Sequence, residues 1–245
     1  MDLELDGRVY IVTGGSRGLG LAAAQALTAE GARVVLTGLS ETVSDAASAL
    51  GGDERAVGVV ADNSDQDAAQ RVVDAALSRF GRLDGILISV GGPPIGTAMD
   101  VTDASWRDAF ESTFLGAIRM ARVAAKAMDG GGSITFVLSS SVREPIPGLA
   151  ISNGLRPGLA MVAKMLTDEL GPSGIRVNGL LPAHVSTERA RALASLTGGA
   201  TPRNALARAG EPMEFGKAAA FLMSPAVPYL TGVMLPVDGG ELRVL

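Results

Sequence analysis

The chain has no cysteine, and one histidine is found among its 245 residues. The absence of cysteine excludes disulfide bonds, catalysis by a thiolate and metal sites with sulfur ligands. A single histidine cannot form the paired-histidine motif of zinc enzymes, so we expect no metal site. Any chemistry must come from hydroxyl, carboxylate or guanidinium groups, or from a bound organic cofactor.

Charged residues and long hydrophobic runs are also scarce. Charged side chains make up 19% of the chain and the formal net charge is −5, which gives no general attraction to nucleic acid or to an anionic membrane. Apolar runs such as Ile86-Leu87-Ile88 have the length of a strand, far short of a membrane span. The segment 1–6 carries acids and does not resemble a signal peptide. We expect a cytoplasmic protein whose partner is a small molecule, with no nucleic acid and no membrane.

Aromatic residues are rare, at 4%, whereas glycine occurs 32 times and hydrophobic residues make up 47% of the chain. Small side chains let helices lie close to a parallel sheet. Buried apolar runs alternate with helical patterns along the sequence, which predicts right-handed βαβ units. The chain is therefore predicted to be a single α/β domain over 1–245, a doubly wound parallel sheet (Rossmann fold) with helices on both faces. Strands are predicted at 9–13, 33–37, 56–60, 85–89, 133–138, 175–181 and 233–237, and the principal helices at 18–30, 40–50, 65–80, 106–128, 152–170 and 214–223.

A long segment without a clear pattern covers about 183–210. It follows the carboxyl end of a predicted strand, where open α/β sheets bind their ligands. Long loops in compact domains are commonly functional. We interpret this segment as a lid on the substrate side.

The first predicted strand leads into the first helix through Thr13-Gly14-Gly15-Ser16-Arg17-Gly18-Leu19-Gly20. Glycines at this point permit a tight turn and bring backbone amides close to a pyrophosphate at the positive end of the helix dipole. A purely structural turn is the alternative, but the strand-to-helix context favours a dinucleotide. We expect Gly14, Ser16, Gly18, Leu19 and Gly20 to contact it.

The end of the second strand predicts which dinucleotide binds. Sites for NAD place an Asp or Glu there to bind the ribose hydroxyls, but here Thr37 to Ser40 contains no acid. Arg17 in the glycine loop can instead bind the 2′-phosphate of NADP. NADPH is therefore the expected cofactor in preference to NAD; the alternative is that Arg17 is a solvated loop residue.

With its loop written T-G-x-x-x-G-x-G, the chain resembles the short-chain dehydrogenase/reductase family over nearly its full length. The resemblance places Asp62, with Asn63 beside it, near the adenine, and Gly91 in the glycine loop after the fourth strand. The run Pro182-Ala183-His184-Val185-Ser186-Thr187 is similar to the family's P-G-x-V-x-T, which implies that Pro182, Val185 and Thr187 face the nicotinamide. Val237-Asp238-Gly239-Gly240 resembles the family's C-terminal signature, and membership implies a homodimer or homotetramer.

The catalytic motif departs from the family pattern. Ser139 matches the family's catalytic serine, but Ser152 stands at the tyrosine position, Arg156 at the lysine position and Thr113 at the asparagine position. The chain thus resembles a divergent branch with S-N-x-x-R in place of Y-x-x-x-K. Arginine can bind ribose and stabilise an oxyanion but cannot release a proton.

Three functions remain open from the sequence. The first is an NADP(H)-dependent oxidoreductase that interconverts a carbonyl and an alcohol. In it Ser139 binds the carbonyl oxygen, Arg156 binds the ribose, and the proton comes from Ser152 through water or from Glu144. The main alternative is a catalytically silent NADP(H)-binding sensor or partner subunit, and the third is non-redox chemistry with the cofactor as a structural element.

Overall fold

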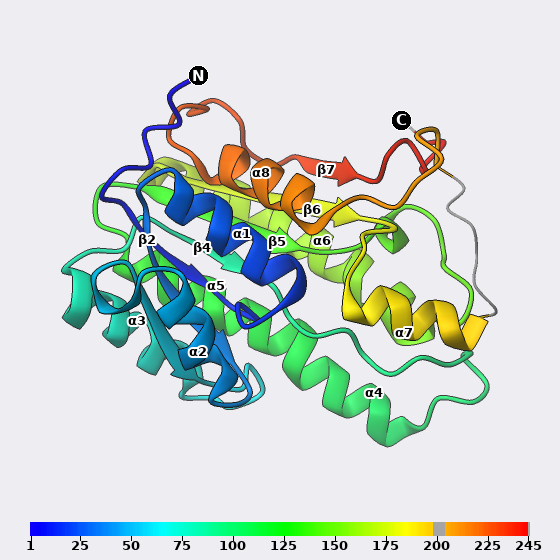
Figure 1. Ribbon diagram of the computed structural model, residues 1–245. Helices are drawn as coiled ribbons and strands as arrows, with labels where there is room; N and C mark the ends of the chain where they lie inside the picture. Colours follow the sequence, from blue (N-terminus) through cyan, green and yellow to red (C-terminus); the bar gives the residue numbers. More distant parts are fainter. Residues whose placement is uncertain (198–203, 245) are drawn as a thin grey trace.

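The described residues form a seven-stranded parallel sheet in the order β3-β2-β1-β4-β5-β6-β7, with helices on both sides (Figure 1). The structure is a computed structural model, and it describes residues 1–197 and 204–244. The strands are β1 (Val9–Val12), β2 (Arg33–Gly38), β3 (Ala56–Val60), β4 (Gly85–Ile88), β5 (Gly132–Val137), β6 (Ile175–Pro182) and β7 (Met234–Val237). The prediction of a doubly wound parallel sheet is confirmed.

Two helical layers cover the sheet. One layer contains α3 (Ala68–Phe80), α5 (Gly116–Ala127) and α6 (Ala150–Leu170), and the other contains α1 (Gly18–Ala29), α2 (Thr42–Ala49) and α8 (Pro212–Met223). Along β1, Val9 and Ile11 belong to the first apolar core, whereas Tyr10 and Val12 belong to the second. Because successive side chains of a strand point to opposite faces, each strand supplies both cores.

The helix predicted at 106–128 is longer and less regular than expected. It starts as α4 (Asp103–Ala109), passes through a π-helical segment, Phe110–Leu115, and continues as α5. The Thr102 hydroxyl accepts a hydrogen bond from the Ser105 amide at 3.2 Å, which caps the N-terminus of α4. The π segment has i→i+5 hydrogen bonds, so each of its turns holds more residues than an α-helical turn. The sequence analysis treats 106–128 as one uninterrupted helix and does not predict this segment.

The segment 183–210 is also more regular than predicted, because it contains the helix α7 (Glu188–Thr197). Before α7, Val185 forms an isolated parallel bridge with Gly210, so both ends of this segment lie close together. In Figure 1, α7 lies at the same end of the molecule as the tip of the β7 arrow. No helix in the described part of the chain is both long enough and apolar enough to cross a membrane.

The order of strands places a crevice beside β1. The chain runs from β1 to β2 and β3 on one side, and then returns so that β4 pairs with β1 on the other side. In an open parallel sheet, ligands bind at the carboxyl ends of the strands where the direction of winding reverses. The glycine loop after β1 and the loop after β4 meet at this point.

Candidate cofactor and catalytic site

The two loops at the crevice are joined by the Thr13 hydroxyl. It donates a hydrogen bond to the Ser89 carbonyl at 3.0 Å and accepts one from the Ser89 amide at 2.8 Å. Gly14 follows with φ +60°, and a Cβ there would lie 2.5 Å from the Ser89 carbonyl oxygen. Glycine is required at this position for both its backbone conformation and its lack of a side chain.

The N-terminus of α1 fits a pyrophosphate. A Cβ on Gly20 would collide with the Gly14 carbonyl oxygen, so the loop folds directly onto the helix. The residue before the helix, Arg17, provides no side-chain cap, and the first turn carries no acid. Uncapped amides at the positive end of a helix dipole bind anions. Beside them, Leu19 packs against the core and Ser16 lies close to Gly38.

Arg17 projects from this loop toward the start of α7. Its Nη1 lies 3.0 Å from the Glu188 carboxylate, and the two side chains are 81% and 67% exposed. Thr187 lies over Gly18, with its methyl group 3.8 Å from where a Gly18 Cβ would be. The Thr187 hydroxyl also accepts a hydrogen bond from the Ala190 amide at 3.2 Å, inside the first turn of α7. The segment from Pro182, which ends β6, through Val185 to Thr187 therefore reaches the phosphate loop.

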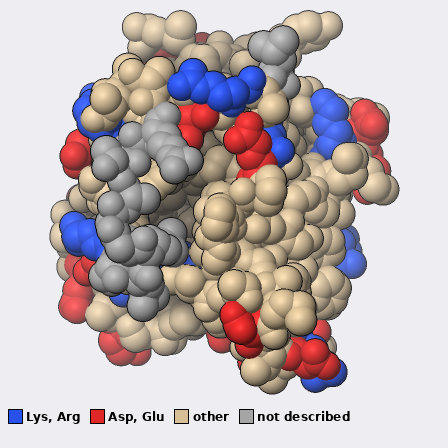
Figure 2. All heavy atoms as spheres, turned by 90° about the vertical axis from the view of Figure 1, so that its right-hand side faces the viewer, with Lys and Arg blue, Asp and Glu red and all other residues tan. Residues whose placement is uncertain are grey.

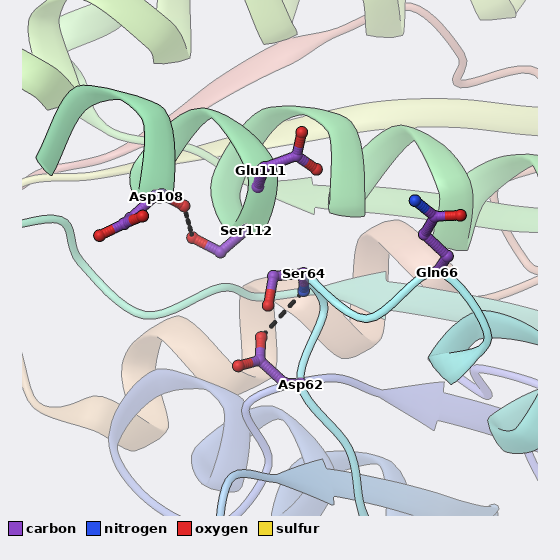
Figure 3. A pocket seen from close by; sticks show the side chains of 6 residues that line it. All are labelled: Asp62, Ser64, Gln66, Asp108, Glu111 and Ser112. Carbon is purple, nitrogen blue, oxygen red and sulfur yellow. Dashed lines mark hydrogen bonds between the residues drawn. The ribbon is translucent and has the colours of Figure 1, made fainter. Parts of the chain in front are cut away.

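Asp62 lies in the loop that follows β3. Its carboxylate accepts a hydrogen bond from the Ser64 amide at 2.9 Å. Figure 3 shows Asp62 and Ser64 on one side of a cavity of about 570 Å³ that is also lined by Asp108 of α4 and by Glu111 and Ser112 of the π-helical segment. The neighbouring Asn63 carbonyl accepts a hydrogen bond from Arg119 at 3.4 Å.

The hydroxyl of Ser152 is hydrogen-bonded to Ser141. The two Oγ atoms are 3.2 Å apart and both side chains are buried. Ser139 lies two residues earlier, where its Oγ accepts a hydrogen bond from the Ser141 amide at 3.1 Å. The hydroxyls after β5 are thus connected to the first turn of α6 through Ser141, a residue that the sequence analysis did not select.

Arg156 is buried beneath these serines, with 6% of the residue exposed. Its Nη1 donates a hydrogen bond to the Val137 carbonyl at the end of β5, at 2.8 Å. Burial, followed by the positive charge of Arg189, lowers the pKa of the Arg156 guanidinium to about 10. Arg156 therefore stays charged at neutral pH and holds a cation inside the site.

Arg189 reaches the same region from α7. Its guanidinium donates hydrogen bonds to the Gly92 carbonyl at 3.0 Å and the Pro93 carbonyl at 2.8 Å, beside Gly91. Burial lowers the pKa of Arg189 as well. Figure 2 views this end of the molecule, where acidic and basic side chains lie together in the upper part of the view above a largely uncharged area.

Asn153 and Thr113 complete the surroundings of the serine cluster. The Asn153 side chain accepts a hydrogen bond from the Ile146 amide at 3.0 Å and donates one to its carbonyl at 2.9 Å. The asparagine of S-N-x-x-R therefore fixes the loop between β5 and α6. Thr113 is buried in the π-helical segment, which packs against α6. No group of three or more potential metal ligands occurs among the described residues.

A family model described as enoyl-(acyl carrier protein) reductase matches residues 14–241. The chain belongs to the short-chain dehydrogenase/reductase family. It is 32% identical over 243 residues to the cis-4-hydroxycyclohexanecarboxylate dehydrogenase of Sinomonas cyclohexanicum, covering 97% of each chain. It is 31% identical over 245 residues to the D-threitol dehydrogenase of Mycolicibacterium smegmatis, covering 98% of this chain and 94% of the relative.

Among solved structures, the L-sorbose reductase of Gluconobacter frateurii, crystallised with NADPH and L-sorbose, superposes with a TM-score of 0.92 at 30% identity over the whole of both chains. The short-chain dehydrogenase/reductase described here is thus an NAD(P)-dependent oxidoreductase that acts on an alcohol or carbonyl compound. The prediction of the family from separate sequence motifs is confirmed. The substituted catalytic positions and the choice of NADP remain predictions.

Proposed function

We propose that this short-chain dehydrogenase/reductase is NADP(H)-dependent and interconverts a carbonyl and an alcohol with a serine–arginine catalytic centre. The observation that carries the proposal is the buried set of Ser141, Ser152 and Arg156 at the carboxyl end of β5. Burying a charged guanidinium is costly, and clusters of this kind are concentrated at functional sites.

The cofactor contacts follow from the crevice. The amides of Gly14, Ser16, Gly18, Leu19 and Gly20 hold the pyrophosphate, Asp62 and Asn63 border the adenine, and Gly91 borders the ribose. Pro182, Val185 and Thr187 position the nicotinamide amide from the lid side. The cofactor, when bound, supplies or accepts the hydride.

Arg17 is the residue that selects NADP over NAD. Its exposed guanidinium lies next to the phosphate loop, and its partner Glu188 is itself exposed, so a 2′-phosphate can displace this weak surface pair. The NADPH in the L-sorbose reductase structure supports the same choice of cofactor.

In the reductive direction, Ser139 and Ser152 donate hydrogen bonds to the substrate oxygen, while Arg156 holds the ribose and stabilises the developing negative charge. The proton on Ser152 Oγ passes to the alkoxide and is replaced from Ser141 Oγ, which recovers its own from water. Thr113 supports α6 from the π-helical segment. Without a dedicated general acid, the reaction is slower by a factor of about 10²–10⁴, so activated carbonyls are the preferred substrates.

The test is NADPH oxidation against ketones, aldehydes and diketones, with Ser139→Ala and Arg156→Ala as variants. We expect turnover that either variant reduces at least tenfold. The loss of the family's tyrosine and lysine supports one alternative, a silent NADP(H)-binding sensor or partner subunit. Tight NADPH binding without turnover of any carbonyl would favour that alternative.

We further propose that the chain is a single cytoplasmic domain that forms homo-oligomers, through the outer face of the π-helical segment and α6. Phe110 is 40% exposed, and Met161 and Met165, four residues apart on α6, are 66% and 57% exposed. A helical face of large apolar side chains is typical of an interface, and a second copy is the proposed partner. Light scattering should show a dimer or tetramer that Met161→Lys and Met165→Lys dissociate.

A further inference from the structure

Arg156 and Arg189 converge on one space from two sides of the site. Arg156 is held by Val137 at the end of β5, and Arg189 by Gly92 and Pro93 in the loop after β4. These strands are neighbours, with Ile88 paired to Phe136 one residue before Val137. The guanidiniums therefore border the same carboxyl edge, one from the sheet and one from the lid helix.

Among residues 1–197 and 204–244, no carboxylate forms an ion pair with either of these two cations. The pKa shifts agree, because burial and Arg189 lower the pKa of Arg156, burial lowers that of Arg189, and no acid raises either.

The hydrogen-bond geometry leaves donors for a ligand. A guanidinium has five N–H groups, and the described residues accept one hydrogen bond from Arg156 and two from Arg189. Two partly satisfied guanidiniums, Arg156 buried and Arg189 exposed on α7, attract an anion with paired oxygens, which each can bind through two parallel hydrogen bonds.

We propose that the substrate carries a carboxylate, which binds to Arg189 and to the N–H groups of Arg156 that the ribose does not use, while its carbonyl or hydroxyl group meets the serine cluster. This inference rests on the proposed function and names the class of substrate: an oxo acid or the corresponding hydroxy acid. Arg189, at the start of α7, is then a specificity-determining residue.

The cofactor's phosphates are the other source of an anion near the site, but they fit this pair less well. Val137 lies on β5, two strands away from β1 and its phosphate loop in the order β1-β4-β5. Two strand spacings amount to about 10 Å. The phosphate loop also has its own cation in Arg17.

The experiment compares acids with their neutral esters on the NADP⁺-loaded protein by calorimetry. Suitable pairs are benzoylformate, acetoacetate and levulinate, each with its ethyl ester, because the carbonyl is kept and the charge is removed. We expect at least one acid to bind tenfold or more tightly than its ester. Arg189→Gln should weaken binding of the acid about 10–100-fold. It should leave binding of the ester and the NADPH dissociation constant unchanged. Arg189→Lys should retain part of the preference.

Arg191→Gln is the matched control, because Arg191 is an exposed arginine two residues along the same helix. It should leave the preference for acids intact. Esters that bind as tightly as every acid would overturn the inference, as would equal weakening of acid and ester by Arg189→Gln. Weaker NADPH binding in Arg189→Gln would assign the cation to the cofactor instead. If no cofactor bound at all, the proposed function would fail, and the same titrations on the free protein would still test the arginine pair.

Discussion

The hydroxyl oxygens of Ser141 and Ser152 lie 3.2 Å apart in a buried contact between the end of β5 and the start of α6. The sequence analysis places Ser152 at the position of the family's proton-donating tyrosine. A serine hydroxyl is shorter and less acidic than a phenol, so the proposed mechanism relies on the contact with a second hydroxyl to return a proton to Ser152 after each turnover.

The first prediction concerns this pair of serines. Ser141→Ala and Ser152→Ala should each lower kcat about 10–100-fold, because each interrupts the same proton relay. The double variant should be no slower than the slower single variant, since groups that act as a unit are not additive. Ser140→Ala, a change at a buried neighbouring serine, is the control and should leave kcat within about twofold. Additive losses would show that the two serines act separately.

The second prediction concerns the cost of the buried cation Arg156. Because burial, with a smaller contribution from the charge of Arg189, lowers its pKa in the folded protein to about 10, its charged form opposes folding fully below that pH, and this cost declines only as the pH rises from about 10 toward the ordinary pKa of a guanidinium. Arg156→Met removes the cost at neutral pH and should raise Tm by a few degrees while it abolishes turnover. Differential scanning calorimetry measures the change. A fall in Tm of more than about 5 °C would instead make Arg156 a structural residue that holds β5.

The third prediction concerns cofactor choice. Arg17→Ala should weaken NADPH binding about 10–100-fold, with little effect on NADH, because only NADPH carries the 2′-phosphate. Glu188→Gln should strengthen NADPH binding up to about threefold, since it frees Arg17 from a surface pair. Fluorescence titration of the wild type and both variants with NADPH and NADH gives the six dissociation constants. If Arg17→Ala weakened the binding of NADPH and NADH equally, Arg17 would not be the residue that binds the 2′-phosphate.

The fourth prediction concerns Arg176, which is structural. Its guanidinium donates to the carbonyls of Leu222, Met223 and Ser224 at 2.9, 3.1 and 2.8 Å, and so caps the carboxyl end of α8. Arg176→Met leaves these buried acceptors unpaired and should lower the free energy of unfolding by about 3–5 kcal/mol. Urea denaturation measures this. The dissociation constant for NADPH, measured well below the transition, should be unchanged; weaker binding would mean that α8 also shapes the cofactor site.

The fifth prediction concerns acid stability. Burial raises the pKa of Asp84, but hydrogen bonds from Arg82 and the Val9 amide outweigh it and hold the pKa below the usual value. The stabilisation is present above the ordinary carboxyl pKa and is lost as the pH falls through the lowered one. Asp84→Asn should therefore be less stable at neutral pH and should lose less stability than the wild type between about pH 5 and pH 3. An equal loss of stability in both proteins over this pH range would contradict this assignment.

The sheet and the phosphate loop could be predicted because their signals are local. Val9 to Val12 form an apolar run bounded by a glycine loop, and the positions of Gly14 and Gly20 are fixed by contacts of the backbone with itself. Patterns of this kind require no knowledge of the tertiary structure.

The arrangement around Arg156 could not be predicted in the same way. Arg189 contacts Gly92 and Pro93 across almost a hundred residues of sequence, and the helix that carries it has no strong apolar pattern. Ser141 was overlooked because the family motif directs attention to Ser139, and the contact with Ser152 depends on how the loop after β5 turns. Asn153 could have been selected, since a side-chain amide in S-N-x-x-R is suited to bind a backbone peptide in both directions.

The measurement that tests the central claim most directly is the transfer of deuterium from NADPH labelled at C4 to a carbonyl substrate, with NADPH binding measured on the same sample. The proposed NADP(H)-dependent oxidoreductase predicts tight NADPH binding and deuterium on the carbinol carbon of the product. Tight NADPH binding with no deuterium in any product would contradict it and would leave a nucleotide-binding protein without redox catalysis.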